Sequence, residues 1–136
     1  MSKRIMYLRD NNNPQGKGNP IGCLAIEMID RPSGGTLVNY QVSVLHPTDR
    51  FDRKLGQLKA LSKLEGSAIC ADVLFEKDIS IHQVSSTVMS HISANKKIPK
   101  RARQAARRWL RSAEAMSFLV DLETTTLQMP GFASRN

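Results

Sequence analysis

The amino-acid sequence predicts an α+β domain in which a mostly antiparallel sheet carries three helices, the last of them strongly basic. Two runs of alternating apolar and polar residues flank a Gly-Gly turn, which is typical of a β-hairpin. Three later segments repeat apolar residues at spacings of three and four, the period of an amphipathic helix. The expected order is three strands, a helix, a strand and two helices. This order favours an antiparallel sheet with helices on one face.

The length and composition indicate one soluble globular domain over residues 1–136. Hydrophobic residues make up 40% of the chain and charged residues 24%, which excludes a disordered or collagen-like protein. No run of about 18 apolar residues occurs, and the N-terminus meets charged residues before a signal-peptide core can form. The two cysteines are too few for a disulfide scaffold or an all-cysteine zinc site. These features predict a cytoplasmic protein.

The N-terminal third predicts a short edge strand and a hairpin. Residues 5–9 alternate weakly, and residues 11–20 are rich in Asn, Gly and Pro and predict a flexible loop. The segments 22–29 and 37–45 alternate more clearly and are joined by a turn at 31–35. On one face of this hairpin we expect the apolar residues of both runs, which are Leu24, Ile26, Met28, Val38, Tyr40, Val42 and Val44.

The middle of the chain predicts a helix followed by a strand. Thr48 or Asp49 offers a helix cap, and Asp52 favours the first turn. A helix over 50–64 is expected to pack on the sheet through residues at helical spacing: Phe51, Leu55, Leu58, Leu61 and Leu64. Gly66 ends this helix, and residues 67–75 are apolar and β-branched enough for a strand.

Two further helices complete the prediction. Ser80 and Gln83 have the spacing of a capping box, and apolar residues continue at helical spacing to Ile92. After a break at 95–99 a last helix begins near Pro99, where proline suits the first turn, and runs to about residue 117. The tail over 121–136 has no strong period and predicts a loop.

The positive charge of the chain is concentrated in one segment. The net charge is +8, and residues 96–111 hold eight basic side chains and no acidic one. The rest of the chain holds twelve basic and twelve acidic residues, so the excess is a local feature. The eight residues are Lys96, Lys97, Lys100, Arg101, Arg103, Arg107, Arg108 and Arg111.

This segment predicts a surface that binds a polyanion. On a helical wheel Lys100, Arg107 and Arg111 share the side of Arg103, while small residues gather on the other side. Arginine guanidinium groups bind phosphate oxygens two at a time. We therefore expect a non-enzymatic protein that binds DNA or RNA through its phosphates, without reading the base sequence, because only Gln104 among the arginines is a base-reading amide. The alternative is a solvated helix face, or one that pairs with acidic residues elsewhere in the fold.

Other interpretations of the last helix are weaker. Trp109 lies on its apolar side and is expected to anchor the helix in the core rather than to stack on bases. The turn before the helix lacks glycine, which disfavours a helix-turn-helix motif. Alanine dominates the apolar side, so insertion into a membrane surface would gain little, and we expect no membrane partner.

The candidates for catalysis or metal binding are few, and we expect no enzyme, no metal and no cofactor. His46 and Asp49 flank a Pro-Thr turn, where such residues more often cap a helix than form an acid–base pair. Cys23 or Cys70 could pair with His46 or His91 as a nucleophile, without any local motif in support. The set Glu76, Asp78 and His82 could hold a divalent metal, although no second cluster completes a coordination shell. Cys70, like Cys23, lies in a predicted strand, where a free thiol behaves as a small hydrophobe.

The stretch from Val42 to Gly56, with Ser43 before Asp49-Arg50-Phe51-Asp52-Arg53-Lys54, resembles a segment of small accessory proteins of phages and other mobile elements. The resemblance covers about 15 residues and maps no functional residue. It implies a protein of the host cytoplasm that binds nucleic acid. It also raises an alternative, an inhibitor that uses the same basic surface against a host nucleoprotein or defence complex such as a CRISPR surveillance complex. A structural or assembly protein with an acidic neighbour is a third possibility. The oligomeric state stays open, and the hairpin edge would suit a dimer.

Overall fold

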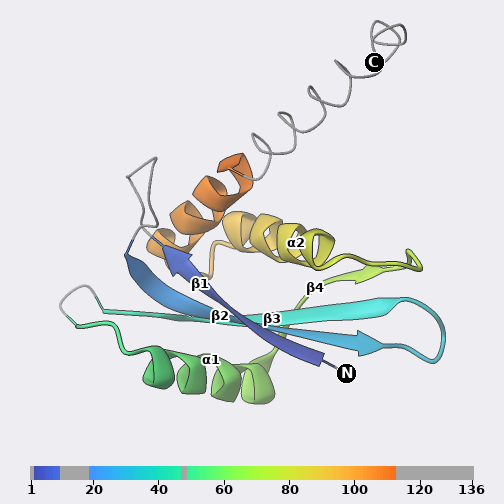
Figure 1. Cartoon of the computed structure of the whole chain (residues 1–136), viewed down its shortest axis with the longest axis horizontal. Coiled ribbons are helices and arrows are strands. Elements are labelled where there is room, and N and C mark those ends of the chain that lie inside the picture. The colour runs from blue at the N-terminus through green and yellow to red at the C-terminus, as the bar shows by residue number, and fades with distance from the viewer. Residues whose placement is uncertain (1, 10–18, 47–48, 113–136) are drawn as a thin grey trace, which may run out of the picture.

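A computed structural model of the chain describes residues 2–9, 19–46 and 49–112. These residues form a four-stranded antiparallel sheet with helices, which confirms the α+β class (Figure 1). The predicted loop at 11–18 and the predicted tail at 121–136 lie outside the described residues. In the described part of the chain, no helix combines the length and the apolar character needed to cross a bilayer.

The sheet is a meander with strand order β1-β2-β3-β4. Strand β1 spans Ser2–Arg9, β2 spans Pro20–Asp30, β3 spans Thr36–Val44 and β4 spans Ile69–Leu74. All three pairings are antiparallel. Each strand pairs with the next one along the chain, and α1 connects β3 to β4. The expected edge strand at 5–9 is confirmed as part of β1.

The β2–β3 hairpin confirms the prediction made from the alternating residues. Its register pairs Asp30 with Thr36 and places the turn at 31–35. Gly34 and Gly35 have φ angles of 106° and 83°. Side chains with a Cβ rarely adopt these angles, and this explains the Gly-Gly pair.

The helices begin and end close to the expected residues. Helix α1 spans Arg53–Ser67 and α2 spans Ile81–Ala94. The side chain of Asp52, rather than Thr48 or Asp49, caps α1 by accepting from Leu55 N at 3.1 Å. Thr48 itself lies outside the described residues. The capping box at the start of α2 is confirmed by reciprocal hydrogen bonds between Ser80 and Gln83.

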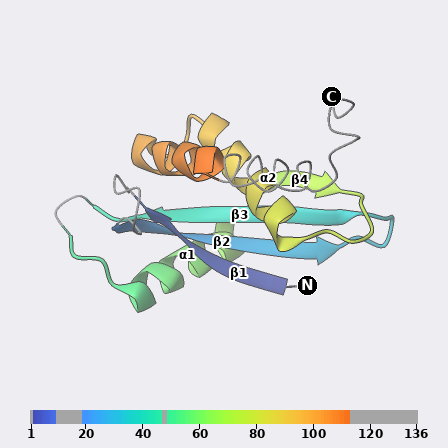
Figure 2. The same cartoon turned by 45° about the horizontal axis from the view of Figure 1, so that its top comes forward.

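The third helix, called here the basic helix, is described over residues 100–112 and follows Pro99 as expected. Together with α2 it covers one face of the sheet, whereas α1 lies on the opposite face (Figures 1 and 2). The expectation of helices on one face is therefore wrong. The reason lies in β2, where every residue from Ile21 to Ile26 is buried, because both faces of this strand are covered.

The larger core lies between the sheet and the pair formed by α2 and the basic helix. The sheet contributes the apolar face that the hairpin pattern predicted, and α2 contributes the side chains at helical spacing. The buried members from the strands and α2 are Leu8, Ile21, Leu24, Ile26, Val38, Tyr40, Val42, Val84, Val88, Met89 and Ile92.

The smaller core lies between the sheet and α1 and consists of Cys23, Ala25, Ala60 and Leu64. Residues of β1, of α1 and of the segment just before α1 complete it: Gln57 Nε2 donates to Tyr7 Oη at 2.6 Å, and the Tyr7 ring meets the Phe51 ring edge-on. The expectation that Leu55 and Leu58 pack on the sheet is wrong, since they are 49% and 65% exposed. The small residues Gly56 and Ala60 face the sheet instead, and a Cβ on Gly56 would lie 2.6 Å from Cys23 Sγ.

Candidate functional site

The basic helix docks on the sheet through small apolar residues. Ala102, Ala105 and Ala106 are buried, and Ile98 in the preceding turn is buried with them. Methyl side chains let the helix backbone approach the sheet closely. The long basic side chains on its other sides then extend outward from a fixed position.

Two of the arginines hold the basic helix against the ends of strands. Arg101 Nη1 donates to the carbonyl oxygen of Leu45, just after β3, at 2.9 Å. Arg108 Nη2 donates to the carbonyl oxygen of Arg9, the last residue of β1, at 3.1 Å. Arg101 and Arg108 are half-buried, and Arg108 Nε is buried without a hydrogen-bond partner in the described part of the chain. These guanidinium groups stabilise the position of the helix.

Two further arginines bind carbonyl groups around the end of α2. Arg107 Nη2 donates to the Ser93 carbonyl in the last turn of α2 at 3.1 Å, and Arg103 Nε donates to the Ile98 carbonyl at 3.0 Å. The last carbonyls of a helix have no partner within the helix and carry partial negative charge, so a guanidinium group there is favourable. Arg107 stays exposed, whereas Arg103 is half-buried.

Four cations of the segment are exposed and make no hydrogen bond or ion pair with any described residue through their side chains. They are Lys96, Lys97, Lys100 and Arg111. Among residues 2–9, 19–46 and 49–112, one ion pair between side chains occurs, and it joins Lys3 to Glu65 at 3.8 Å. The alternative that the segment pairs with carboxylates of its own fold therefore finds no support among these residues.

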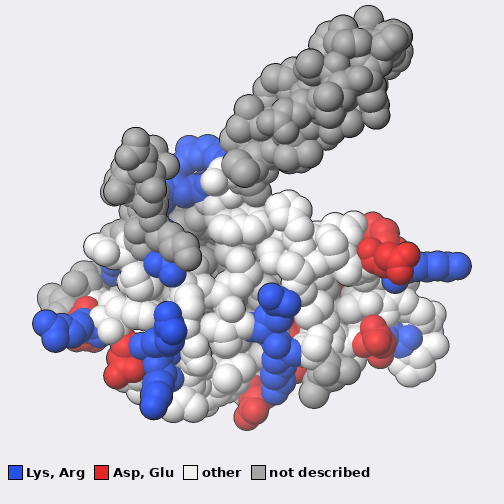
Figure 3. Space-filling model, viewed as in Figure 1, with Lys and Arg blue, Asp and Glu red and all other residues white. Residues whose placement is uncertain are grey.

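The surface around the basic helix is positive. Figure 3 shows blue side chains without red ones at the top of the view, where the described end of the basic helix lies. The red side chains in this view lie lower or to the right, away from the basic helix. Like charges on one helix repel, so this arrangement costs stability unless a bound anion compensates for it.

Trp109 belongs to the packing of this helix, as predicted. It is half-buried against the larger core, and its ring lies 5.8 Å from the ring of His82 in α2 with an interplanar angle of 31°. The face turned toward His82 is not open to a nucleic-acid base.

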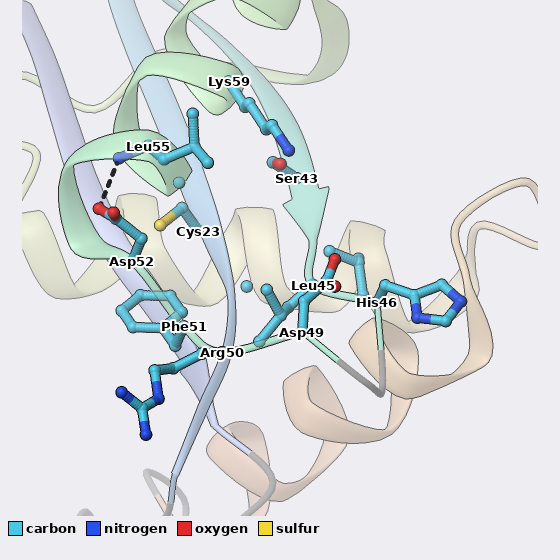
Figure 4. Close-up of a pocket in the computed structure, with 13 residues that line it drawn as sticks. Cys23, Ser43, Leu45, His46, Asp49, Arg50, Phe51, Asp52, Leu55 and Lys59 are labelled. Atoms are coloured by element: carbon cyan, nitrogen blue, oxygen red, sulfur yellow. Dashed lines mark hydrogen bonds between the residues drawn. The ribbon is translucent and has the colours of Figure 1, made fainter.

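The structure separates the residues considered for catalysis. Cys23 points into the α1 side of the sheet, whereas His91 lies on the other side, where its Nδ1 is 2.6 Å from Tyr40 Oη. Cys23 and His46 both line one pocket, but Figure 4 shows the His46 ring directed away from it. Burial raises the pKa of the Cys23 thiol, which disfavours the nucleophilic thiolate. Asp49 also lines this pocket, and its backbone N–H donates to the His46 carbonyl at 2.9 Å.

No metal cluster is formed by the residues considered for one. Glu76, Asp78 and His82 are all described, and no group of three potential ligands able to hold a metal ion occurs among the described residues. The second thiol, Cys70, is exposed on β4 rather than buried, and neither cysteine forms a disulfide.

Two hollows that sequence reasoning did not predict lie between α1 and the end of β3. The first has a volume of about 340 Å³ and the second about 500 Å³, and both are lined by Ser43, Val44 and Lys59. Figure 4 shows the Lys59 amine directed toward Ser43. The sequence shows that α1 contains Leu55 and Leu58, but it does not show which side of the helix meets the sheet, and this side decides whether they are exposed.

Comparisons with protein families, with curated proteins and with solved structures found no match to this chain. The site must therefore be interpreted from its own geometry.

Proposed function

We propose that this protein binds nucleic acid without catalysing a reaction on it, through a surface formed by Lys96, Lys97, Lys100, Arg107 and Arg111. The observation that carries the proposal is the exposure of these five cations on a helix and turn that pack on the sheet and are hydrogen-bonded to its strand ends, with no carboxylate of the described residues paired to them. We call these five residues the basic surface.

The chemistry of the basic surface suits phosphate rather than bases. Cations that bind phosphates displace condensed counterions, and affinity then falls steeply with salt. The side chains that read bases are scarce here, since Gln104 is the one exposed amide of the basic helix and Trp109 is packed on His82. Binding should therefore depend little on sequence. Arg101, Arg103 and Arg108 are half-buried and donate to backbone carbonyls, so we infer that they position the basic helix, and the phosphate contacts expected for them stay a prediction.

An acidic surface of a protein, such as a host nucleoprotein or defence complex, is the second candidate for the same site. The lack of an available stacking platform on the basic surface favours it, because an acidic protein needs only charge and shape. In either case we place the protein in a cytoplasm, and the two unpaired cysteines support this assignment.

The test compares two triple variants with the same change in charge. In the first, Lys100→Glu, Arg107→Glu and Arg111→Glu alter the basic surface. In the control, Arg31→Glu, Lys54→Glu and Lys77→Glu alter exposed cations elsewhere in the fold. Each variant is titrated with labelled single- and double-stranded DNA and RNA at several salt concentrations, beside the unaltered protein.

For the unaltered protein on duplex DNA we expect log K to fall against log salt with a slope of about −3 to −5, matching the five cations. The first variant should lose three contacts, so that its slope becomes shallower by about 2.7. The control variant should keep the original slope. An equal loss in both variants would mean that only the total charge matters, and no binding near physiological salt would leave the acidic protein partner as the better proposal.

A further inference from the structure

The end of β3 has one side without a neighbouring strand. Strand β4 pairs with β3 only from Thr36 to Tyr40, whereas β3 continues to Val44. The hydrogen bond from Leu45 N to the Ile21 carbonyl shows that residue 45 faces β2. Because backbone groups alternate in an antiparallel pair, the N–H and C=O groups of Val42 and Val44 point to the side that lacks a strand. We call this side the open edge of β3.

Side chains of the protein itself occupy part of the open edge. Val42 N donates to Gln41 Oε1 at 3.0 Å, and Lys63 Nζ donates to the Val42 carbonyl oxygen at 3.2 Å. No hydrogen bond from a described residue reaches the outward-facing backbone of Val44. Lys63 reaches this edge from helix α1, and a charged side chain that covers a strand edge protects it against accidental pairing but can move aside for a specific partner.

Helix α1 forms a wall beside the open edge. The two hollows share Ser43, Val44 and Lys59, so they lie next to each other along the end of β3, and we call them together the groove. Leu55 lines the first hollow and Leu58 the second, which places two of the exposed leucines of the protein at the groove. A strand edge beside an apolar wall is the arrangement that binds an extended peptide.

The charge of the groove selects among partners. The first hollow is lined by Arg50 and Lys59 and by two carboxylates, Asp49 and Asp52, of which Asp52 caps α1. The second hollow is lined by Lys59 and Lys63 and by no acidic residue, so this end of the groove is positive. Glu65 of the same helix pairs with Lys3 of β1. A second copy of this chain would bring Lys59 and Lys63 against their own counterparts, which is unfavourable.

We propose that this groove binds an extended acidic segment of a protein partner, which adds a strand to the open edge of β3. The backbone of the segment pairs with Val42 and Val44. The glutamate side chains of the segment, which all lie on the side of the added strand that faces α1, bring their carboxylates to Lys59 and Lys63 and their methylene groups to Leu58. The proposal rests on residues other than those of the basic surface, which lies on the other face of the sheet, although Arg101 of the basic helix reaches the Leu45 carbonyl just after β3.

The test uses a fluorescein-labelled synthetic hexapeptide in which Glu and Val alternate, titrated against the full chain by fluorescence anisotropy. Lys59→Glu is the test variant, because Lys59 makes no hydrogen bond with described residues and its loss should leave the fold intact. Lys54→Glu is the matched control, since Lys54 is an exposed residue of the same helix that does not line the groove. We expect Lys59→Glu to weaken binding by about tenfold, and Lys54→Glu to change it less than about twofold.

Two altered peptides test the mode of binding. A hexapeptide with Lys in place of Glu should not bind, and one with N-methyl groups on alternate amides should bind at least about tenfold more weakly, because strand pairing needs these N–H groups. Equal effects of the two protein variants, or equal binding of the N-methylated peptide, would overturn the proposal. So would displacement of the peptide by duplex DNA, which would make the occupant a polyanion, or a dimer in sedimentation that the peptide dissociates, which would make it a second copy.

Discussion

The two faces of the sheet are built from different kinds of residue. Against α2 and the basic helix, the sheet presents large side chains such as Leu24, Ile26 and Tyr40, all fully buried. Against α1, it presents Cys23 and Ala25. Beneath α2 the sheet therefore fills the space with side-chain volume, whereas beneath α1 its small residues let the backbone of the helix come close.

The difference explains which apolar residues remain outside. Because α1 approaches through Gly56 and Ala60, its leucines at 55 and 58 are turned away from the sheet. On the other face Val84, Val88 and Ile92 of α2 point inward and are buried, whereas Ile81 at the start of the same repeat is exposed. An apolar repeat in a helix thus predicts burial only where the facing strand offers large partners, and small residues on the strand indicate a close contact instead.

The largest expected effect contrasts the two cores. Ile92→Ala should lower the free energy of unfolding by about 4 kcal/mol, because Ile92 is surrounded by large side chains that cannot collapse into the space. Leu64→Ala should cost about 2 kcal/mol, since the smaller core loses fewer contacts. Urea unfolding followed by circular dichroism measures both. Equal costs would contradict the contrast between a volume-filled and a closely approached face.

The next effect distinguishes arginines that hold the fold from those available for binding. Arg108→Ala removes the hydrogen bond to the Arg9 carbonyl and should lower the free energy of unfolding by about 1.5–3 kcal/mol. Arg111→Ala should change it by less than about 0.5 kcal/mol, because Arg111 is exposed and has no described partner. For DNA affinity we expect Arg111→Ala to be the more damaging of the two once both proteins are confirmed to be folded. If Arg111→Ala were the more destabilising variant and Arg108→Ala the one that weakens DNA binding more, this assignment of the two arginines would be wrong.

A double-mutant cycle tests the close approach of α1. A Cβ on Gly56 would lie 2.6 Å from Cys23 Sγ, so Gly56→Ala introduces a clash that offsets the gain of about 1 kcal/mol from replacing glycine in a helix. In a Cys23→Ala background the sulfur is gone, and Gly56→Ala should be stabilising. We expect a coupling free energy of about 1–2 kcal/mol from thermal or urea unfolding. Additive effects would show that the two residues do not touch.

The smallest expected effect is the response of each face to alkaline pH. Burial raises the pKa of the Cys23 thiol above its ordinary 9.0, and burial raises that of Tyr40 above 10.0, partly offset by the hydrogen bond with Asn95. Above these ordinary values the unfolded chain releases protons that the folded chain retains. The free energy of unfolding should therefore fall as pH rises, by up to about 1.4 kcal/mol per pH unit and group.

Variants assign this alkaline loss to the two faces. Unfolding in urea between pH 8 and pH 11 should show the loss beginning near pH 9 in the unaltered protein. Cys23→Ala should remove the part that begins near pH 9, and Tyr40→Phe the part that begins near pH 10. A profile unchanged by either substitution would mean that these groups titrate alike in the folded and unfolded chains.

Local features of the sequence predicted local structure well. The hairpin follows from alternation around Gly34 and Gly35, and the start of α2 follows from Ser80 and Gln83, because each depends on residues a few positions apart. The side of α1 that meets the sheet was predicted incorrectly at Leu55 and Leu58, which are exposed. The run Cys23-Leu24-Ala25-Ile26 is apolar without alternation, which is the pattern of a strand buried on both faces and would have indicated a helix on each side.

The sequence by itself determined the α+β class, the ends of most helices and strands, and the concentration of eight positive charges between residues 96 and 111. These properties follow from the chemistry of neighbouring residues. Only the tertiary structure decided which arginines bind backbone carbonyls of β1, of α2 and of the residue after β3, which cations face solvent, and where β3 lacks a partner strand. Such contacts join residues as far apart as Arg9 and Arg108, and their partners are backbone groups that every residue carries, so no pattern of side chains along the chain can reveal them.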